Sequence, residues 1–213
     1  MPHDLATDLT HAIAGLRLLD HPFYRRWEAG ALQAGELADY AAQYRHFEAS
    51  LPTTLRDLLT QIDDGPAADL VRRNLADEES NPEPHVALFE RFAQAVGAAS
   101  EAAPTAATQA LLDTYRRLIE ASGAEGLAAL VAYEMQAPDI AASKAQGLRD
   151  HYGLDDRATQ FWDVHATMDR DHASWAIGAL ETLPATEGTV VDATRTAATA
   201  WWTFLDDREA AAV

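Results

Sequence analysis

The sequence predicts an all-α protein, a compact helical bundle of about seven to eight helices in a single domain spanning residues 1–213. Ala-, Leu- and Glu-rich stretches with apolar residues at helical intervals alternate with short segments that contain Gly or Pro. No run of alternating β-branched residues is long enough to predict a sheet. Because the connections are short, neighbouring helices should pack side by side around one core.

The helices follow from the apolar periodicity and from the Gly and Pro residues that interrupt it. Asp155 and Thr189, with Asp4 or Thr7, are suitable residues for helix N-caps. The expected helices are residues 5–19, 34–62, 66–80, 85–98, 105–122, 124–151, 156–181 and 190–207.

Pro138 falls inside the predicted helix 124–151 and allows two interpretations. A proline within a helix frees the carbonyl of the residue four positions earlier, Glu134, and kinks the helix there. Alternatively, Pro138 divides two ordinary helices. The residues alone favour neither.

The most informative feature is a polar stripe on the apolar face of helix 156–181. His165, Asp169 and His172 lie within roughly 60° of one another at about 100° per residue, on a face that also carries Phe161 and Trp162. Burying an unpaired carboxylate costs several kcal/mol or more. Two imidazoles and a carboxylate on one buried face therefore suggest a shared metal cation.

Two further segments place acidic or imidazole groups on apolar faces. Glu78 follows Val71 and Leu75 at helical spacing, and His85 opens the next helix. Glu134 shares a face with Leu127, Leu130 and Val131. Any one of these residues alone is more often a satisfied core polar group or a surface charge. Together they form a set of three carboxylates and three imidazoles from four helices, which suits iron or manganese, with zinc possible. The candidate metal ligands are Glu78, His85, Glu134, His165, Asp169 and His172.

Composition excludes several classes of function. The chain has no Cys, so it can form no disulfide, thiolate site or iron–sulfur cluster. A net charge of −18 disfavours nucleic acid and anionic membranes as partners. No stretch of about 18 apolar residues predicts a membrane span, and the polar N-terminus does not resemble a signal peptide. We therefore expect a cytoplasmic protein.

At this point the motifs resemble a known superfamily, the heme-oxygenase-like diiron oxidases and oxygenases near the PqqC and TenA families. The resemblance covers roughly residues 15–182. HPFYRRWEAGALQAGELADYAAQYRHFEASLP is similar to the opening of these proteins, and NLADEESNPEPHVALFERFAQAVG to the motif that supplies a Glu and a His seven residues later. AYEMQAPDIAASKAQGLRDHYGL and FWDVHATMDRDHASWA resemble the remaining motifs. All six candidate ligands match, which implies a heme-oxygenase-like fold holding two transition-metal ions, Fe/Fe or Fe/Mn.

Within the superfamily, the chain resembles the group of the Chlamydia protein associating with death domains. Members of this group are para-aminobenzoate synthases of folate biosynthesis that use their own side chains: a tyrosine supplies the ring and a lysine the amine. The resemblance implies such roles for residues that match Tyr24, Tyr40, Tyr133 and Lys144. The last of these is the only lysine of the chain. TenA-like thiaminases use a Cys, which this chain lacks, and PqqC needs no such ligand set.

The implied enzyme is an O₂-dependent oxidase that needs O₂ as cosubstrate and an external reductant; a homodimer is possible. One alternative is an oxygenase acting on an exogenous amine, amino acid or fatty acid, and another is a non-enzymatic interaction module with a structural metal. Helical spacing puts Lys144 about 80° off the face of Glu134 and roughly 15 Å along the helix. A kink at Pro138 and the length of the lysine side chain could bring it to the metal site.

Overall fold

The computed structural model describes residues 4–80 and 82–211, with the side chains of residues 168–175 outside the description. These residues form ten α-helices, one short 3₁₀ helix and no strand, so the predicted all-α class is confirmed and the number of helices is higher than expected. The elements are α1 (Leu5–Ile13), η1 (Leu18–Asp20), α2 (Pro22–Glu28), α3 (Ala34–Leu59), α4 (Pro66–Ser80), α5 (His85–Ala95), α6 (Ala106–Ala121), α7 (Gly123–Glu134), α8 (Ala137–Tyr152), α9 (Asp156–Leu180) and α10 (Glu187–Ala210).

The predicted helix 5–19 is wrong beyond Ile13, where α1 ends shortly before Gly15. The short helix α2 then begins anew at Pro22, a residue that suits the first turn of a helix because it needs no N–H partner. His21 caps this helix, since its Nδ1 accepts a hydrogen bond from the backbone N–H of Phe23 (3.1 Å). This separate helix carries Tyr24 and Trp27, both buried.

The predicted helix 124–151 is two helices, so Pro138 divides them rather than kinking one. Helix α7 ends at Glu134, and α8 begins at Ala137 with Pro138 in its first turn. Pro138 has no N–H to donate to the carbonyl of Glu134, and its ring obstructs a continuous helix. The consequence is that Glu134 and Lys144 belong to different helices.

Side-chain caps explain other helix boundaries. Asp4 and Asp155 cap α1 and α9 as predicted, each accepting a backbone N–H in the first turn. Helix α10 is capped by Thr186 rather than by Thr189, because the Thr186 hydroxyl accepts the N–H of Thr189 (3.2 Å). The helix therefore starts earlier than the sequence indicated.

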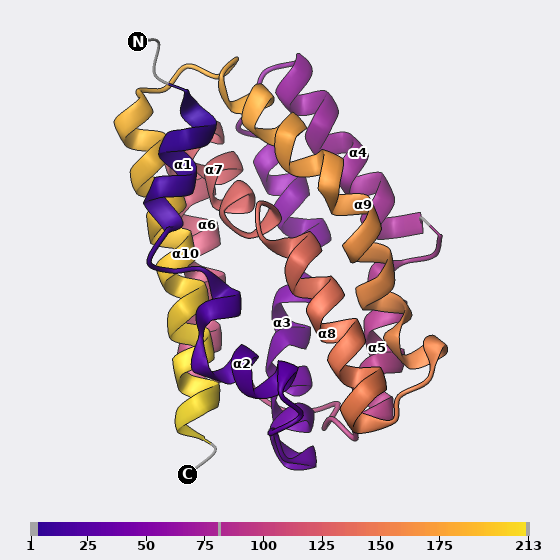
Figure 1. Ribbon diagram of the computed structural model, residues 1–213. Coiled ribbons are helices and arrows are strands. Elements are labelled where there is room, and N and C mark those ends of the chain that lie inside the picture. Colours follow the sequence, from indigo (N-terminus) through magenta and orange to yellow (C-terminus); the bar gives the residue numbers. More distant parts are fainter. Residues whose placement is uncertain (1–3, 81, 212–213) are drawn as a thin grey trace.

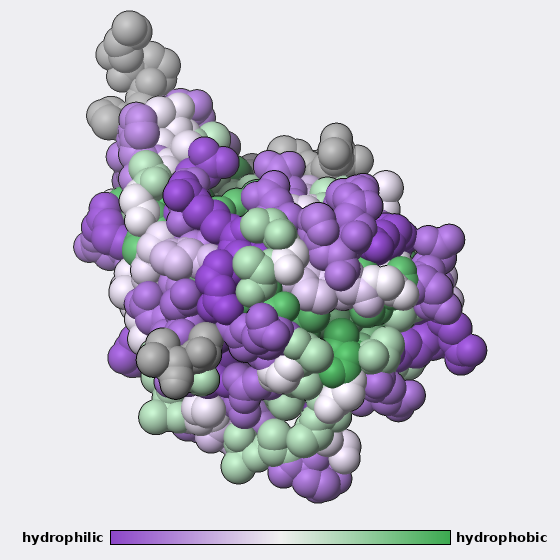
Figure 2. All heavy atoms as spheres, turned by 60° about the horizontal axis from the view of Figure 1, so that its bottom comes forward, coloured by the Kyte–Doolittle hydropathy of each residue, from purple (hydrophilic) through white to green (hydrophobic). Residues whose placement is uncertain are grey.

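Helices α3 and α7 run through the middle of the bundle (Figure 1). Helix α3 packs against α4, α5 and α6, while α7 packs against α6, α9 and α10, so each has neighbours on several sides. The core contains Trp27, Trp162 and Trp201, all buried. Hydrophilic residues cover most of the face in Figure 2, with smaller hydrophobic areas between them. None of the described helices combines the length and apolarity needed to cross a membrane.

Candidate functional site

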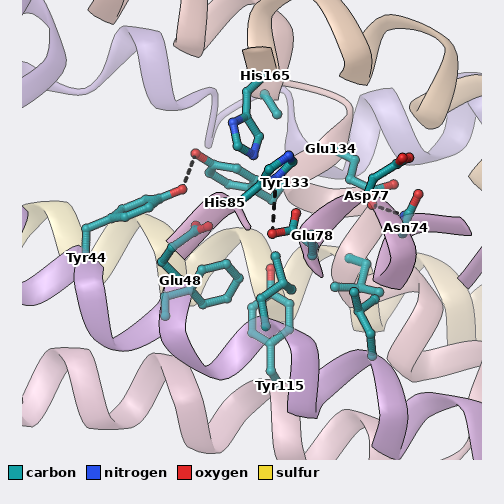
Figure 3. A pocket seen from close by; sticks show the side chains of 15 residues that line it. Tyr44, Glu48, Asn74, Asp77, Glu78, His85, Tyr115, Tyr133, Glu134 and His165 are labelled. Carbon is teal, nitrogen blue, oxygen red and sulfur yellow. Dashed lines mark hydrogen bonds and ion pairs between the residues drawn. The ribbon is translucent and has the colours of Figure 1, made fainter. Parts of the chain in front are cut away.

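A small cavity of about 60 Å³ lies inside the bundle, with walls from helices α3 to α9. Phe47, Leu51, Leu55 and Leu130 form part of its apolar wall. Polar side chains from several helices meet on its other walls (Figure 3). They are Glu48, Asn74, Asp77, Glu78, His85, Glu134 and His165, together with Tyr44, Tyr115 and Tyr133.

Three of the predicted ligands converge at one point of this cavity. Glu78, His85 and His165 each offer a ligand atom, and these atoms lie within 4.8 Å of one another. His85 Nδ1 lies 3.2 Å from Glu78 Oε2, and the two imidazole rings meet edge to face at 4.7 Å. A carboxylate and two imidazoles at such distances can bind one transition-metal ion.

The backbone of α9 orients His165 for this role. His165 Nδ1 lies 2.8 Å from the carbonyl oxygen of Phe161, one turn earlier on the helix. A carbonyl only accepts, so Nδ1 carries the proton and Nε2 keeps its lone pair for a metal. Burial lowers the pKa of His165 to about 4, with the nearby His85 acting in the same direction and Glu78 opposing it. The imidazole therefore stays neutral at neutral pH, as a ligand must.

Glu134 faces the same cavity from the last turn of α7. Its Oε1 accepts a hydrogen bond from Asn74 Nδ2 (3.0 Å), a contact between α7 and α4. Burial, together with the neighbouring Glu78, raises the pKa of Glu134 to about 7, although the Asn74 hydrogen bond opposes the shift. The carboxylate is thus expensive to ionise without a cation nearby.

The side chains that line the cavity are suited to bind a metal ion. Four carboxylates and two imidazoles line the cavity, and its described lining contains no Lys or Arg. Glu134 Oε2 and Asn74 Oδ1 are buried acceptors with no hydrogen-bond partner among the described residues. Buried acceptor oxygens without donors are costly unless a cation neutralises them. The cavity is therefore suited to bind cations with nitrogen and oxygen ligands.

The remaining two predicted ligands, Asp169 and His172, have side chains outside the described residues. Their backbone belongs to α9, one and two turns after His165. Four of the six predicted ligands thus line one cavity, and the other two stay predictions.

Tyr133 connects the cavity with a group of aromatic side chains. Its hydroxyl lies 3.0 Å from that of Tyr44, within hydrogen-bonding distance, and its ring stacks on Trp201 at 4.6 Å. The Tyr44 ring stacks in turn on Tyr40 at 5.6 Å. Burial raises the pKa of Tyr44 and Tyr40 well above the usual range, so both phenols remain protonated.

Lys144 does not line the described wall of the metal cavity, although it lies close enough to His165 to lower the pKa of that imidazole, so the reach of its side chain to the metal site stays a prediction. It lies instead in a buried group of aromatic rings that we call the lysine cage. Its Nζ donates a hydrogen bond to the Tyr40 hydroxyl (2.6 Å), and the Tyr40 hydroxyl lies 2.9 Å from that of Tyr24. The amine is 4.1 Å from the ring centre of Trp162 and 4.5 Å from that of Tyr24. The rings of the cage are those of Tyr24, Trp27, Tyr40, Tyr44 and Trp162.

The cage keeps the lysine amine uncharged. Burial lowers the pKa of Lys144 well below its ordinary value. A neutral amine has a lone pair available for bond formation, whereas an ammonium does not. Gly147 makes room for one cage wall, because a Cβ at this position would meet the Trp27 ring at 3.0 Å.

The sequence-based reasoning missed Glu48 and Asn74. Glu48 is 2% exposed and lines the cavity from α3. It lies one turn after Tyr44 and four residues before Pro52, the same spacing that separates Glu134 from Pro138. Asn74 lies one turn before Glu78, on the same face of α4. A polar residue one helical turn from a buried aromatic residue, as for Glu48, or from a candidate ligand, as for Asn74, is the pattern that could have identified both.

Fold and site define a class of protein: a heme-oxygenase-like helical bundle with a carboxylate- and histidine-lined centre. A domain from Shewanella denitrificans with a heme oxygenase-like fold superposes with a TM-score of 0.81 at 14% identity, over 99% of this chain and 94% of that one. A CADD-like protein of unknown function from Nostoc punctiforme has a TM-score of 0.82 at 16% identity, over 98% and 97% of the two chains.

Sequence relationships give the family. Residues 38–202 match the family of iron-containing redox enzymes. The chain is 38% identical to a 4-aminobenzoate synthase of Nitrosomonas europaea, over 91% of this chain and 86% of the relative. It is 31% identical to a 4-aminobenzoate synthase of Chlamydia pneumoniae, over 92% and 91% of the two. The chain belongs to the iron-containing redox enzyme family, which does not fit the alternative of a non-enzymatic interaction module.

Proposed function

We propose that this protein is a 4-aminobenzoate synthase that builds its product from its own Tyr24 and Lys144. The observation that carries the proposal is the lysine cage, where the chain's single lysine is buried and neutral beside two hydrogen-bonded phenols. A lysine buried without an acidic partner among the described residues is costly as a structural element. It is useful as a nitrogen donor, because its amine is unprotonated at neutral pH.

The chemistry of the product fits the neighbours of Lys144. Forming 4-aminobenzoate from tyrosine requires a bond from nitrogen to the ring carbon that carries the phenol oxygen, loss of that oxygen, and cleavage between Cα and Cβ. Cβ becomes the carboxyl carbon and takes its oxygens from O₂ or water, the phenol oxygen leaves as water, and oxidative loss of the nitrogen leaves Cε of the lysine as an aldehyde. The oxidant is O₂, used with an external reductant.

The geometry favours Tyr24 over Tyr40 as the source of the ring. Lys144 Nζ donates its hydrogen bond to the Tyr40 hydroxyl and lies 4.9 Å from the centre of that ring, but it lies closer to the ring centre of Tyr24, at 4.5 Å. The Tyr40 hydroxyl is within hydrogen-bonding distance of both the amine and the Tyr24 hydroxyl, so we assign Tyr40 the role of holding the two reactants together.

The metal cavity would supply the oxidising power. Glu78, His85, His165 and Glu134 would hold two iron ions, or iron and manganese, with the predicted ligands Asp169 and His172. When bound, the metals would activate O₂ for oxidation of a nearby phenol. Tyr133, Tyr44 and Tyr40 connect the cavity to the cage through a hydroxyl contact of 3.0 Å and a ring stack of 5.6 Å. Phenols in such contact can pass an electron and a proton between neighbours.

The size of the cavity argues against an exogenous substrate. Sites for drug-sized ligands occupy about 300–1,000 Å³, whereas this cavity measures about 60 Å³. The space suits O₂ or water but not a fatty acid. A reaction on the protein's own side chains needs no larger cavity.

Isotope labelling tests the proposal directly. Protein made with ¹⁵N-lysine and ring-¹³C-tyrosine is loaded with iron and exposed to O₂ and reductant, with no substrate added. We expect 4-aminobenzoate carrying both labels, in an amount that stops near one per chain, because Lys144 is the only lysine. Peptide mapping should show mass loss at Tyr24. Unlabelled product, or product only when an amine or acid is supplied, would exclude the proposal.

A further inference from the structure

Glu48 is a buried acid for which the proposed reaction has no role so far. It is 2% exposed and lies on α3, one turn after Tyr44 and two turns after Tyr40. The same helix face therefore borders the lysine cage at one end and the metal cavity at the other. Figure 3 shows the Glu48 side chain extending from α3 toward the part of the cavity where Tyr133, His85 and Glu78 lie.

The surroundings of Glu48 are rich in negative charge. The other ionisable groups with acid or imidazole side chains on the described cavity wall are Asp77, Glu78, Glu134, His85 and His165. None of them is a permanent cation, and Lys144 lies in the cage beyond the phenols. A carboxylate buried among carboxylates is tolerated when cations bind between them.

A second observation points to a ligand in the same space. Asn74 is 7% exposed and lines the cavity, and its Oδ1 has no hydrogen-bond partner among the described residues. Glu134 Oε2 is a further buried acceptor of this kind. Acceptor oxygens facing one cavity need a hydrogen-bond donor or a cation.

We propose that Glu48 is a carboxylate ligand of the metal centre, in addition to the six-residue set. The inference rests on the proposed metal-dependent function. The ligand atoms of Glu78, His85 and His165 already form one compact group. Glu48 lies outside this group, so it serves the second metal position.

The test compares two variants that remove one negative charge from the same cavity. Glu48→Gln keeps the size of the side chain but loses its charge and its strength as a ligand. Asp77→Asn removes an equal charge from another wall residue. Iron content and affinity are measured anaerobically, by elemental analysis and by competition with a chelator of known affinity.

We expect Glu48→Gln to bind its second iron at least 10-fold more weakly, the low end of the effect of altering a metal's supporting residues. Asp77→Asn should stay within a few-fold of the wild type. Equal losses in both variants would mean that Glu48 acts through its charge alone, and full iron binding by Glu48→Gln would exclude a ligand role. Either result overturns the inference while the wild type still binds iron and forms product. A wild type that binds no iron would overturn the proposed metal centre as well.

Thermal unfolding supplies a readout that does not depend on activity. The metal-free Glu48→Gln protein should still unfold in one cooperative transition, which shows that the fold is retained. Added Fe(II) should raise its unfolding temperature less than that of the wild type. Glu48→Asp keeps the charge with a shorter reach, and it should also bind iron more weakly. If Fe(II) stabilises all three proteins equally, Glu48 is not a ligand.

Discussion

The metal cavity and the lysine cage occupy the same core, yet they bury polar groups in opposite ways. The cavity gathers four carboxylates and two imidazoles, and no Lys or Arg lies on its described wall. The cage surrounds one amine with five aromatic rings and gives it a phenol as its hydrogen-bond acceptor.

The difference shows how one core can prepare two kinds of chemistry. Carboxylates placed together favour binding of cations, because only positive charge relieves their desolvation and mutual repulsion. Burial among the rings lowers the pKa of the Lys144 amine, because the ammonium form loses its hydration there. The contact between Tyr44 and Tyr133 joins these regions, while Lys144 itself is not part of the described wall of the metal cavity.

The largest effect is expected from changing the cage. Lys144→Arg should abolish formation of 4-aminobenzoate while leaving iron content unchanged, because a guanidinium stays protonated and cannot donate its nitrogen in the same way. Lys144→Met, which fits an apolar cage better, should give the same result. As a control, Gln146→Lys added to Lys144→Arg places a lysine on the exposed face of α8 and should not restore product. Wild-type amounts of product from Lys144→Arg would exclude the self-sacrificing reaction.

Replacing ligands in the metal cavity should weaken iron binding while the protein stays folded. His165→Ala and Glu134→Ala should each lower iron affinity by at least about 100-fold. Loss of a residue that only supports a metal ligand lowers affinity by about 10–100-fold, and each of these variants deletes a ligand itself. Elemental analysis after desalting measures the effect, and circular dichroism checks the helices. Full iron occupancy in both variants would show that the assignment of the cavity is wrong.

Changing the contact between the two regions should slow the reaction without removing the metal or the lysine. Tyr44→Phe deletes the hydroxyl contact with Tyr133 but keeps the ring stack. We expect product formation to slow by roughly 10- to 100-fold, the scale on which misplacing a reacting group slows a reaction, with iron content unchanged. Tyr152→Phe serves as the control, because this phenol lies outside both regions and accepts a hydrogen bond from the backbone N–H of Leu32. Equal rates in both variants would contradict a role for Tyr44.

The smallest effect concerns the stability of the metal-free protein. The pKa of Glu134 is raised from 4.5 to about 7 in the fold, so its ionised form destabilises the native state above about pH 7. This penalty disappears as the pH falls from 7 to 4.5. Metal-free Glu134→Gln should therefore be more stable than the metal-free wild type at pH 8, by about 1–3 kcal/mol, and equally stable near pH 4.5. Urea unfolding at both pH values measures the difference, and a gap that does not change with pH would contradict the assigned cause.

Much of the fold and the types of ligand could be predicted from local patterns. Apolar periodicity with Gly and Pro breaks placed most helices within a few residues, because helix formation depends on neighbours three and four positions apart. The same periodicity placed Glu78, Glu134 and His165 on apolar faces, and all three line one cavity. Polar residues on buried faces are detectable in a sequence because their cost has to be offset by a partner.

Local patterns failed where boundaries or partners depended on distant residues. Pro138 allowed a kink or a break in the sequence, and the structure has the break, with α7 ending at Glu134 and α8 beginning at Ala137. Glu48 resembles an ordinary helix-surface charge in the sequence, and only the packing of α4, α5, α6 and α7 around α3 buries it at 2% exposure.

By itself, the sequence determined that this protein is helical, lacks cysteine, holds one lysine, and carries acidic and imidazole groups on faces that must be buried. The tertiary structure decided what those groups meet. Lys144 reaches Tyr40, 104 positions away, and Tyr44 meets Tyr133, 89 positions away. Helical periodicity tells which residues share a face, but the identity of the opposing face depends on how whole helices pack, and the cage and the cavity exist only between helices.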